Sequence, residues 1–221
     1  MKIVEHKTAQ NFLTATKMWL LRNEGVNAVA LGIAANLASD SPNYDEYYFA
    51  SFESEGNVIG TAMMTPPFPI NINSDDIGMI SEFVNYAKQI PPPSGVLGPG
   101  NFAKEFADKW CLESGCKIGT EEAQAIHELK SVNHPPNVGE IIVATEEHAE
   151  LLNEWGAAFC VDCDMKKDLP RVPAGTINAI KNKSRYLLLI DGVPVTMAAK
   201  ARETENGGTI NYVYTPSKHR K

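Results

Sequence analysis

The stretch that decides the fold is Arg185-Tyr-Leu-Leu-Leu-Ile190, followed by Asp191-Gly192 and Val193-Pro-Val-Thr-Met-Ala-Ala-Lys-Ala-Arg202. Asp-Gly between two runs of strand-forming residues is a strong β-hairpin signal, because both residues tolerate the positive φ of a tight turn. A Gly207-Gly208 turn then leads into Thr209-Ile-Asn-Tyr-Val-Tyr-Thr215. The pattern predicts three antiparallel strands connected as a meander.

The residues before this meander predict a strand, a helix and a segment with two interpretations. Ile141-Ile-Val-Ala144 has the pattern of a strand, and Thr145 caps the helix that follows it. Apolar residues recur on one face of that helix and give it a buried stripe, formed by Leu151, Leu152, Trp155 and Phe159. Pro170 to Lys183 is either a loop or a second helix, weakened by Pro173 and Gly175.

The first part of the chain shows a similar series of patterns. Helices are predicted to begin after a cap at Thr8, at Val26, at Asp75 or Asp76, and after Gly100. Strands are predicted at 2–6, 47–54, 58–64, 96–97 and 123–132, the last from the apolar residues Ile126, Leu129 and Val132. Because the element order begins again after His134-Pro135-Pro136, we expect an α/β (α+β) fold of two mixed sheets packed with helices. The expected domains are residues 1–135 and 136–221.

The bulk composition is that of a globular protein and argues against two classes of partner. The 221 residues are 43% hydrophobic and 21% charged, which is enough apolar material for a core. A net charge of −7 argues against nucleic acid or an anionic membrane as the main partner, since both require a basic surface. The run Val26 to Ala38 is too short to span a bilayer, and Met1 to His6 lacks the apolar core of a signal peptide. We expect a soluble, cytoplasmic protein.

The cysteines form two close pairs. Cys111 and Cys116 have four residues between them, and Cys160 and Cys163 form a Cys-x-x-Cys. Two such pairs can make a zinc site, but each begins at the end of an amphipathic helix rather than in a glycine-rich knuckle. We expect no metal and reduced, mostly buried thiols.

Five motifs spread along the chain carry a resemblance to a known family. They are Gly60-Thr-Ala-Met-Met-Thr-Pro-Pro67, Gly95-Val-Leu-Gly-Pro99, Phe106-Ala-Asp-Lys-Trp110, Leu151-Leu-Asn-Glu-Trp155 and Val213-Tyr-Thr-Pro216. Together they resemble the bacterial subgroup of predicted GNAT N-acetyltransferases that has an additional N-terminal GNAT-like half. The resemblance runs almost from end to end. It implies two GNAT-like halves, acetyl-CoA as acyl donor, and a small-molecule or peptide amine as acceptor.

The same resemblance assigns residues to binding acetyl-CoA. In GNAT proteins a bulge splays the fourth strand, and its freed backbone N–H groups bind the pantetheine arm and the thioester carbonyl. Here that role falls to Val213, Tyr214 and Thr215. An Arg/Gln-x-x-Gly-x-Gly/Ala loop then cradles the pyrophosphate, and Arg220 and Lys221 are its first two residues here. The resemblance therefore implies an incomplete C-terminal half, truncated before this loop and impaired in acetyl-CoA binding.

Candidates for acid–base catalysis come from position and residue type. An amine that attacks a thioester needs a base near its nitrogen, directly or through water. The candidates are Glu140, which precedes the first strand of the second half, and the phenols Tyr212 and Tyr214. The histidines are scattered along the chain, and none has a partner in sequence that would orient it.

Two classes of function remain open at this point. One is an acetyl-CoA-dependent N-acetyltransferase. The other is a non-catalytic GNAT-like module for binding or interaction. In either class an unfinished sheet presents a strand edge through which two copies can pair, so a homodimer is a further expectation.

Overall fold

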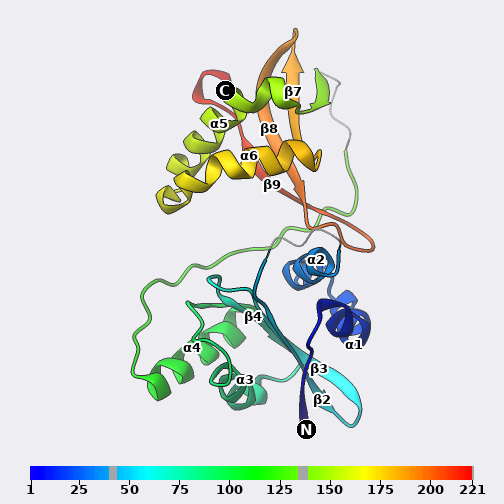
Figure 1. The fold of residues 1–221 in the computed structure, drawn as a ribbon, viewed down its shortest axis with the longest axis vertical. Helices are drawn as coiled ribbons and strands as arrows, with labels where there is room; N and C mark the ends of the chain where they lie inside the picture. The colour runs from blue at the N-terminus through cyan, green and yellow to red at the C-terminus, as the bar shows by residue number, and fades with distance from the viewer. Residues whose placement is uncertain (40–43, 134–138, 221) are drawn as a thin grey trace. The chain divides into compact units, whose positions relative to one another are not determined.

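The computed structural model describes residues 1–39, 44–133 and 139–220. It divides into two compact units, Met1–Leu129 and Lys130–Lys221, each with its own sheet (Figure 1). The mixed α/β class predicted from the sequence is confirmed. The predicted boundary between residues 135 and 136 falls outside the described residues.

The sheet of the N-terminal unit is mixed. Its strands, in spatial order, are β1 (Lys2–Glu5), β2 (Tyr48–Ser54), β3 (Asn57–Met64), β4 (Ile70–Ser74) and β5 (Val96–Leu97). The first four pair in antiparallel fashion, and β5 runs parallel to β4. The predicted strands at 2–6, 47–54, 58–64 and 96–97 are therefore confirmed to within a residue or two.

Helices cover both faces of this sheet (Figure 1). They are α1 (Ala9–Leu21), α2 (Ala28–Leu37), the 3₁₀ turn η1 (Ile77–Met79), α3 (Ile80–Ala87) and α4 (Gly100–Ser114). Successive side chains of a strand point to opposite faces, so Phe49 packs under α1 while Phe52 packs under α3. Phe12 stacks on Phe49 at 4.6 Å between ring centroids, and Phe83 on Phe52 at 3.8 Å. Each face thus has its own aromatic core.

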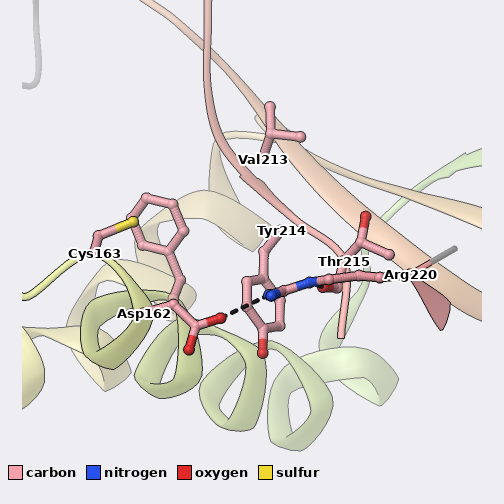
Figure 2. Close-up of a pocket in the computed structure, with 7 residues that line it drawn as sticks. Asp162, Cys163, Val213, Tyr214, Thr215 and Arg220 are labelled. Carbon is pink, nitrogen blue, oxygen red and sulfur yellow. Dashed lines mark hydrogen bonds and ion pairs between the residues drawn. The ribbon is translucent and has the colours of Figure 1, made fainter. Parts of the chain in front are cut away.

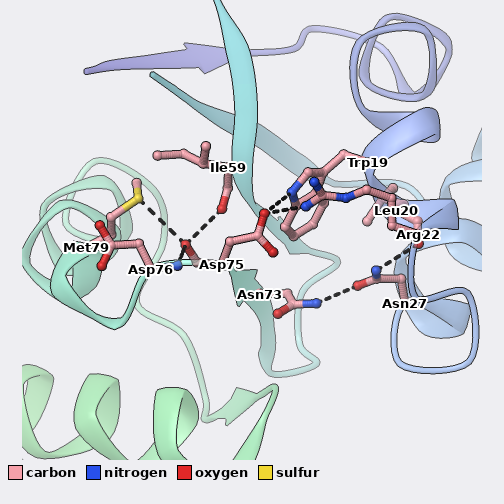
Figure 3. Close-up of polar contacts among 10 residues, drawn as sticks. Trp19, Leu20, Arg22, Asn27, Ile59, Asn73, Asp75, Asp76 and Met79 are labelled. Carbon is pink, nitrogen blue, oxygen red and sulfur yellow. Dashed lines mark hydrogen bonds and ion pairs between the residues drawn. The ribbon is translucent and has the colours of Figure 1, made fainter. Parts of the chain in front are cut away.

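Polar contacts connect α1 and the start of α2 to β4 and to the residues between β4 and η1 (Figure 3). The indole N–H of Trp19 donates to Asp75 Oδ2 at 2.8 Å, and Arg22 pairs with the same carboxylate. The buried Asn27 donates to a backbone carbonyl of α1 and accepts from Asn73 at 2.7 Å. The polar atoms of Trp19 and Asn27 in this network are hydrogen-bonded to other protein atoms. We therefore assign the network a structural role.

In the N-terminal unit one strand was missed and one predicted strand is wrong. β4 was not predicted, although Ile70 and Ile72 alternate with polar residues and are fully buried. Residues 123–132 form no strand, and Ile126 and Leu129 are 63% and 76% exposed. Side chains of a strand alternate between its two faces, so apolar residues three positions apart point to opposite faces. Ile126, Leu129 and Val132 therefore cannot form one apolar face that a strand would bury.

The C-terminal unit has an antiparallel sheet with helices on one face (Figure 1). Its strands, in spatial order, are β6 (Glu140–Val143), β7 (Arg185–Ile190), β8 (Val193–Ala201) and β9 (Thr209–Tyr214). Its helical segments are η2 (Glu146–His148), α5 (Ala149–Asp162), η3 (Lys166–Arg171), α6 (Val172–Lys181) and η4 (Ser217–His219). The predicted meander is confirmed as β7, β8 and β9. Asp191 and Gly192 have φ of 50° and 77°, as a hairpin turn of this kind requires.

The segment left open at residues 170–183 contains a helix. Pro173 lies in the first turn of α6, where a missing backbone N–H costs no helical hydrogen bond. α5 and α6 bury Leu152, Trp155 and Ile180 against Leu187 of β7. This packing fixes the end of α5 over β9, where the candidate site lies.

The thiols differ from the prediction. Cys160 is buried, but Cys116 and Cys163 are exposed, because the turns after α4 and α5 carry them out of the helix interfaces. Within the described ranges no three His, Cys, Asp or Glu side chains come together as metal ligands. None of the helices in these ranges has the length and apolar character needed to cross a membrane.

Candidate functional site

A β-bulge interrupts the pairing of β9 with β8. Met197 pairs with Tyr214 and Ala199 with Asn211, so Tyr212 and Val213 together face the single residue Ala198. A bulge leaves one residue without its ladder partner and bends the strand. The bulge expected in this strand from the resemblance is therefore present.

Tyr212 makes the bulge with a strained backbone. Its φ is 54°, in the left-handed region that non-glycine residues rarely adopt. Such a conformation costs about 1–3 kcal/mol and persists only where packing imposes it. The packing here is visible: the ring lies 4.4 Å from that of Phe159 of α5, and the hydroxyl is 3.5 Å from the Gly156 carbonyl oxygen.

Gly156 allows this close approach of the phenol to α5. A Cβ at this position would lie 2.7 Å from Cγ1 of Val172 and 3.2 Å from the hydroxyl oxygen of Tyr212. The missing side chain therefore leaves the space that Tyr212 and α6 occupy. Burial raises the pKa of Tyr212 to about 12, so its hydroxyl is protonated at neutral pH and can donate a hydrogen bond.

A pocket of about 420 Å³ opens beside the bulge, between the end of α5 and the end of β9 (Figure 2). Its lining comprises Phe159, Asp162, Cys163, Val213, Tyr214, Thr215 and Arg220. Within residues 139–220, β9 is paired on one side only, by β8. The backbone beside the pocket therefore includes both a bulge and a strand edge.

Arg220 closes one side of this pocket (Figure 2). Its Nε donates to the Thr215 carbonyl oxygen at 2.6 Å, and its Nη2 donates to Asp162 Oδ2 at 2.6 Å. The guanidinium carbon lies 5.4 Å from the ring centroid of Tyr214. The hydrogen bond to Asp162 raises the pKa of Arg220, so the guanidinium stays protonated, and the Asp162 carboxylate balances its charge. A guanidinium has five N–H donors, so these bonds leave donors for a ligand.

Thr196 of β8 fixes the end of β9. Its hydroxyl donates to the Tyr214 carbonyl oxygen at 2.8 Å and accepts from the Thr215 hydroxyl at 2.8 Å. Trp155 lies beneath Tyr214, with ring centroids 6.4 Å apart. The segment that lines the pocket is thus held by both β8 and α5.

The predicted site residues divide into four groups. Val213, Tyr214, Thr215 and Arg220 come together in the pocket, whereas Tyr212 turns toward a second cavity on the side of α6. Glu140 lies in β6, at the opposite edge of the sheet and three inter-strand spacings from β9. At about 4.8 Å per spacing this separation is about 14 Å. Lys221 lies outside the described residues.

Three residues of the pocket, Phe159, Asp162 and Cys163, were not predicted as part of a site. Asp162 and Cys163 come from the end of α5, and Asp162 is 58 positions from its partner Arg220. The one sequence signal for Asp162 is a carboxylate in the last turn of a helix, where the helix dipole disfavours negative charge. An acidic residue in such a position often has a cationic partner elsewhere in the fold.

The second cavity has a volume of about 240 Å³ and a different chemistry. It is lined by Cys160, Met165, Asp168, Arg171, Val172, Gly175, Thr176, Arg185 and Tyr212. The guanidinium carbon of Arg185 stands 4.0 Å above the centroid of the Tyr212 ring. Tyr212 and Val213 are adjacent in the bulge, so neighbouring residues of the bulge line the two cavities.

Comparisons with known proteins gave matches among solved structures alone. No protein-family model matches the chain, and no curated protein matches it. One solved structure that matches is an acetyltransferase of the GNAT family from Colwellia psychrerythraea, with 12% identity, a TM-score of 0.46, and coverage of 100% of this chain and 80% of that one. Another is a tandem GNAT protein from the clavulanic acid biosynthesis pathway, with 12% identity, a TM-score of 0.43, and coverage of 99% and 80%. Both are named as GNAT proteins, the family that the sequence motifs resemble.

Proposed function

We propose that the C-terminal unit binds an acyl-coenzyme A thioester at the bulge of β9 and transfers its acyl group to an amine. The simplest donor is acetyl-CoA, so the proposed activity is that of an N-acetyltransferase. The proposed location is the cytoplasm. The observation that carries the proposal is the bulge itself, with Tyr212 and Val213 opposite Ala198 and a pocket beside it.

The bulge suits a thioester because of where charge develops. When an amine attacks the carbonyl carbon, negative charge grows on the carbonyl oxygen, and backbone N–H groups fixed nearby stabilise it. A bulge frees such groups from the ladder, and here Thr196 and Trp155 hold the segment in place. The free edge of β9 can pair with the amides of a pantetheine arm as it would with another strand.

Arg220 supplies charged N–H donors for a phosphorylated ligand, although Asp162 balances its charge in the free protein. Guanidinium groups bind phosphate oxygens through paired, charge-assisted hydrogen bonds. Asp162 and the Thr215 carbonyl hold the guanidinium at the rim of the pocket. A ligand that lies along β9 would therefore reach Arg220 with its phosphate end.

The reaction needs one proton removed and one supplied. The amine nitrogen forms a bond to the acyl carbon and loses a proton to solvent water, and the carbon–sulfur bond breaks to release a thiolate that takes up a proton. Tyr214 lines the pocket and is the candidate donor to that thiolate. Tyr212 is protonated, but its hydroxyl faces the Gly156 carbonyl and its side chain lines the second cavity, so it is not the donor to this thiolate. Glu140 lies too far from the pocket to reach the amine directly.

Titration of acetyl-CoA, followed by calorimetry, tests the proposal on the full chain. We expect binding that weakens about three- to tenfold in Arg220→Gln, because a half-exposed charge contributes less than a buried one. Lys218→Gln removes the same charge from an exposed position that does not line the pocket, and should change affinity less than about twofold. Absence of binding at millimolar acetyl-CoA would refute the proposal and favour the non-catalytic binding module.

A further inference from the structure

Arg185 is a buried arginine without a carboxylate partner in the described part of the chain. Its side chain begins β7 and is 9% exposed. Its Nε has no hydrogen-bond partner, and its Nη1 faces the sulfur of Met197 at 3.9 Å, a weak acceptor. The main contact of the guanidinium is the face of Tyr212 at 4.0 Å.

Such an arrangement is costly unless something else satisfies the charge. Buried charges in proteins are normally paired and hydrogen-bonded, because removing an ion from water is unfavourable. A cation over an aromatic ring recovers part of that cost but satisfies none of the N–H donors. Burial lowers the pKa of Arg185, yet an arginine stays protonated in proteins. The site therefore has donors for an anion that the described part of the chain does not supply.

The cavity that Arg185 lines has the charge and size for a small anion. The other charged residues of its lining, Asp168 and Arg171, pair with each other at 3.1 Å. The lining therefore has one positive charge in excess. A volume of about 240 Å³ lies below the roughly 300–1,000 Å³ of pockets for drug-sized ligands, so the ligand is small.

We infer that this cavity binds the carboxylate of a small organic acid, with Arg185 as the residue that binds it. A guanidinium fork matches a carboxylate through two parallel hydrogen bonds, and one carboxylate neutralises the excess charge. Val172, Met165 and Tyr212 provide an apolar wall for a short carbon chain. Phosphate, with a charge nearer two, fits the single excess charge less well.

The position of the cavity links it to the acyl-transfer site. Tyr212 lines the carboxylate cavity, and the next residue, Val213, lines the thioester pocket. If the carboxylate belongs to the acyl acceptor, which rests on the proposed function, the acceptor is an amino acid or a related amino carboxylate. The binding of a carboxylate stands without that step.

The test uses the full chain and needs no acyl donor. Propionate and propionamide have nearly the same shape, but only propionate is charged, and each is titrated while amide chemical shifts are followed by NMR. We expect propionate to bind at least about tenfold more tightly than propionamide, since charge-assisted hydrogen bonds are the strong ones. Arg185→Gln should lose about tenfold in propionate affinity, and the matched charge change Lys167→Gln, at an exposed residue outside the lining, less than about twofold.

Two further variants keep the test decisive if Arg185→Gln does not fold. Arg185→Lys keeps the charge but loses the fork, and it should weaken propionate binding. Asp168→Asn removes the negative charge of the lining and should increase the affinity for propionate about two- to fivefold. Equal binding of propionate and propionamide, or tighter binding of inorganic phosphate than of propionate, would overturn the inference. Binding of acetyl-CoA without binding of propionate would also overturn the inference of a carboxylate site, but it would leave the proposed function intact.

Discussion

Replacing Gly156 by alanine tests whether the close packing of α5 against Tyr212 shapes the bulge. Two effects oppose each other in this variant. Alanine in a helix interior is more favourable than glycine by about 1 kcal/mol. The new Cβ, however, would lie 2.7 Å from Val172 Cγ1 and 3.2 Å from the Tyr212 hydroxyl oxygen, and both must move.

The magnitude follows from comparing Gly156 with a second helical glycine. Inserting a methyl group into a close-packed site costs about 1–3 kcal/mol, so Gly156→Ala should be neutral or destabilising by up to about 2 kcal/mol. Gly175 lies in α6, and a Cβ there meets no atom within 4 Å. Gly175→Ala should therefore stabilise the unit by about 0.5–1 kcal/mol. The helix propensity term is common to both variants, so their difference of about 1–3 kcal/mol isolates the cost of crowding.

Urea unfolding followed by tryptophan fluorescence measures this difference. Trp155 reports on the C-terminal unit when Trp19 and Trp110 of the N-terminal unit are replaced by phenylalanine. Equal stabilisation by Gly156→Ala and Gly175→Ala would show that Tyr212 does not depend on this contact. The account of the strained bulge would then be wrong.

Three further predictions concern single sites. Burial lowers the pKa of His6, which lies 2.9 Å from the Ser51 hydroxyl. Below about pH 6.5 the unfolded chain therefore binds more protons than the folded one, and the N-terminal unit should lose stability. In His6→Gln the urea concentration at the unfolding midpoint should depend less on pH in this range. The hydrogen bond with Cys111 lowers the pKa of Cys116. Iodoacetamide should therefore alkylate the exposed Cys116 of the wild-type chain at a lower pH than Cys116 of the Cys111→Ala variant. The same pH profile of alkylation in both proteins would contradict this. Thr196→Val removes two hydrogen bonds to the end of β9 and should cost about 1 kcal/mol in urea unfolding.

Local signals predicted most elements of the fold. The Asp191-Gly192 turn fixed the hairpin, and Thr8 caps α1 by accepting from the Asn11 N–H, as its position before an apolar stripe indicated. β4 was missed because Pro66, Pro67 and Pro69 stand next to a strand of five residues. Prolines disfavour a central strand, but these lie in the turn before it and remove no ladder hydrogen bond.

The site was predictable only where its residues are close in sequence. Val213, Tyr214, Thr215 and Arg220 fall within eight positions, and a local motif identified them together. The contribution of Asp162 depends on how α5 packs over β9, which no local pattern specifies. Burial of Arg185 could not be predicted either, since a strand that begins with arginine normally places it in solvent.

The two cavities of the C-terminal unit depend on one irregularity in the backbone. In a regular strand Tyr212 and Val213 would each face one partner on β8, but here the extra residue forces Tyr212 into a positive φ. That turn presents the phenol to α5, α6 and Arg185, while Val213 borders the pocket of about 420 Å³. A strain of about 1–3 kcal/mol at a single residue persists only if the contacts on both sides compensate it. A carboxylate bound by Arg185 would strengthen one side, so occupation of one cavity should stabilise the strand geometry that the other requires.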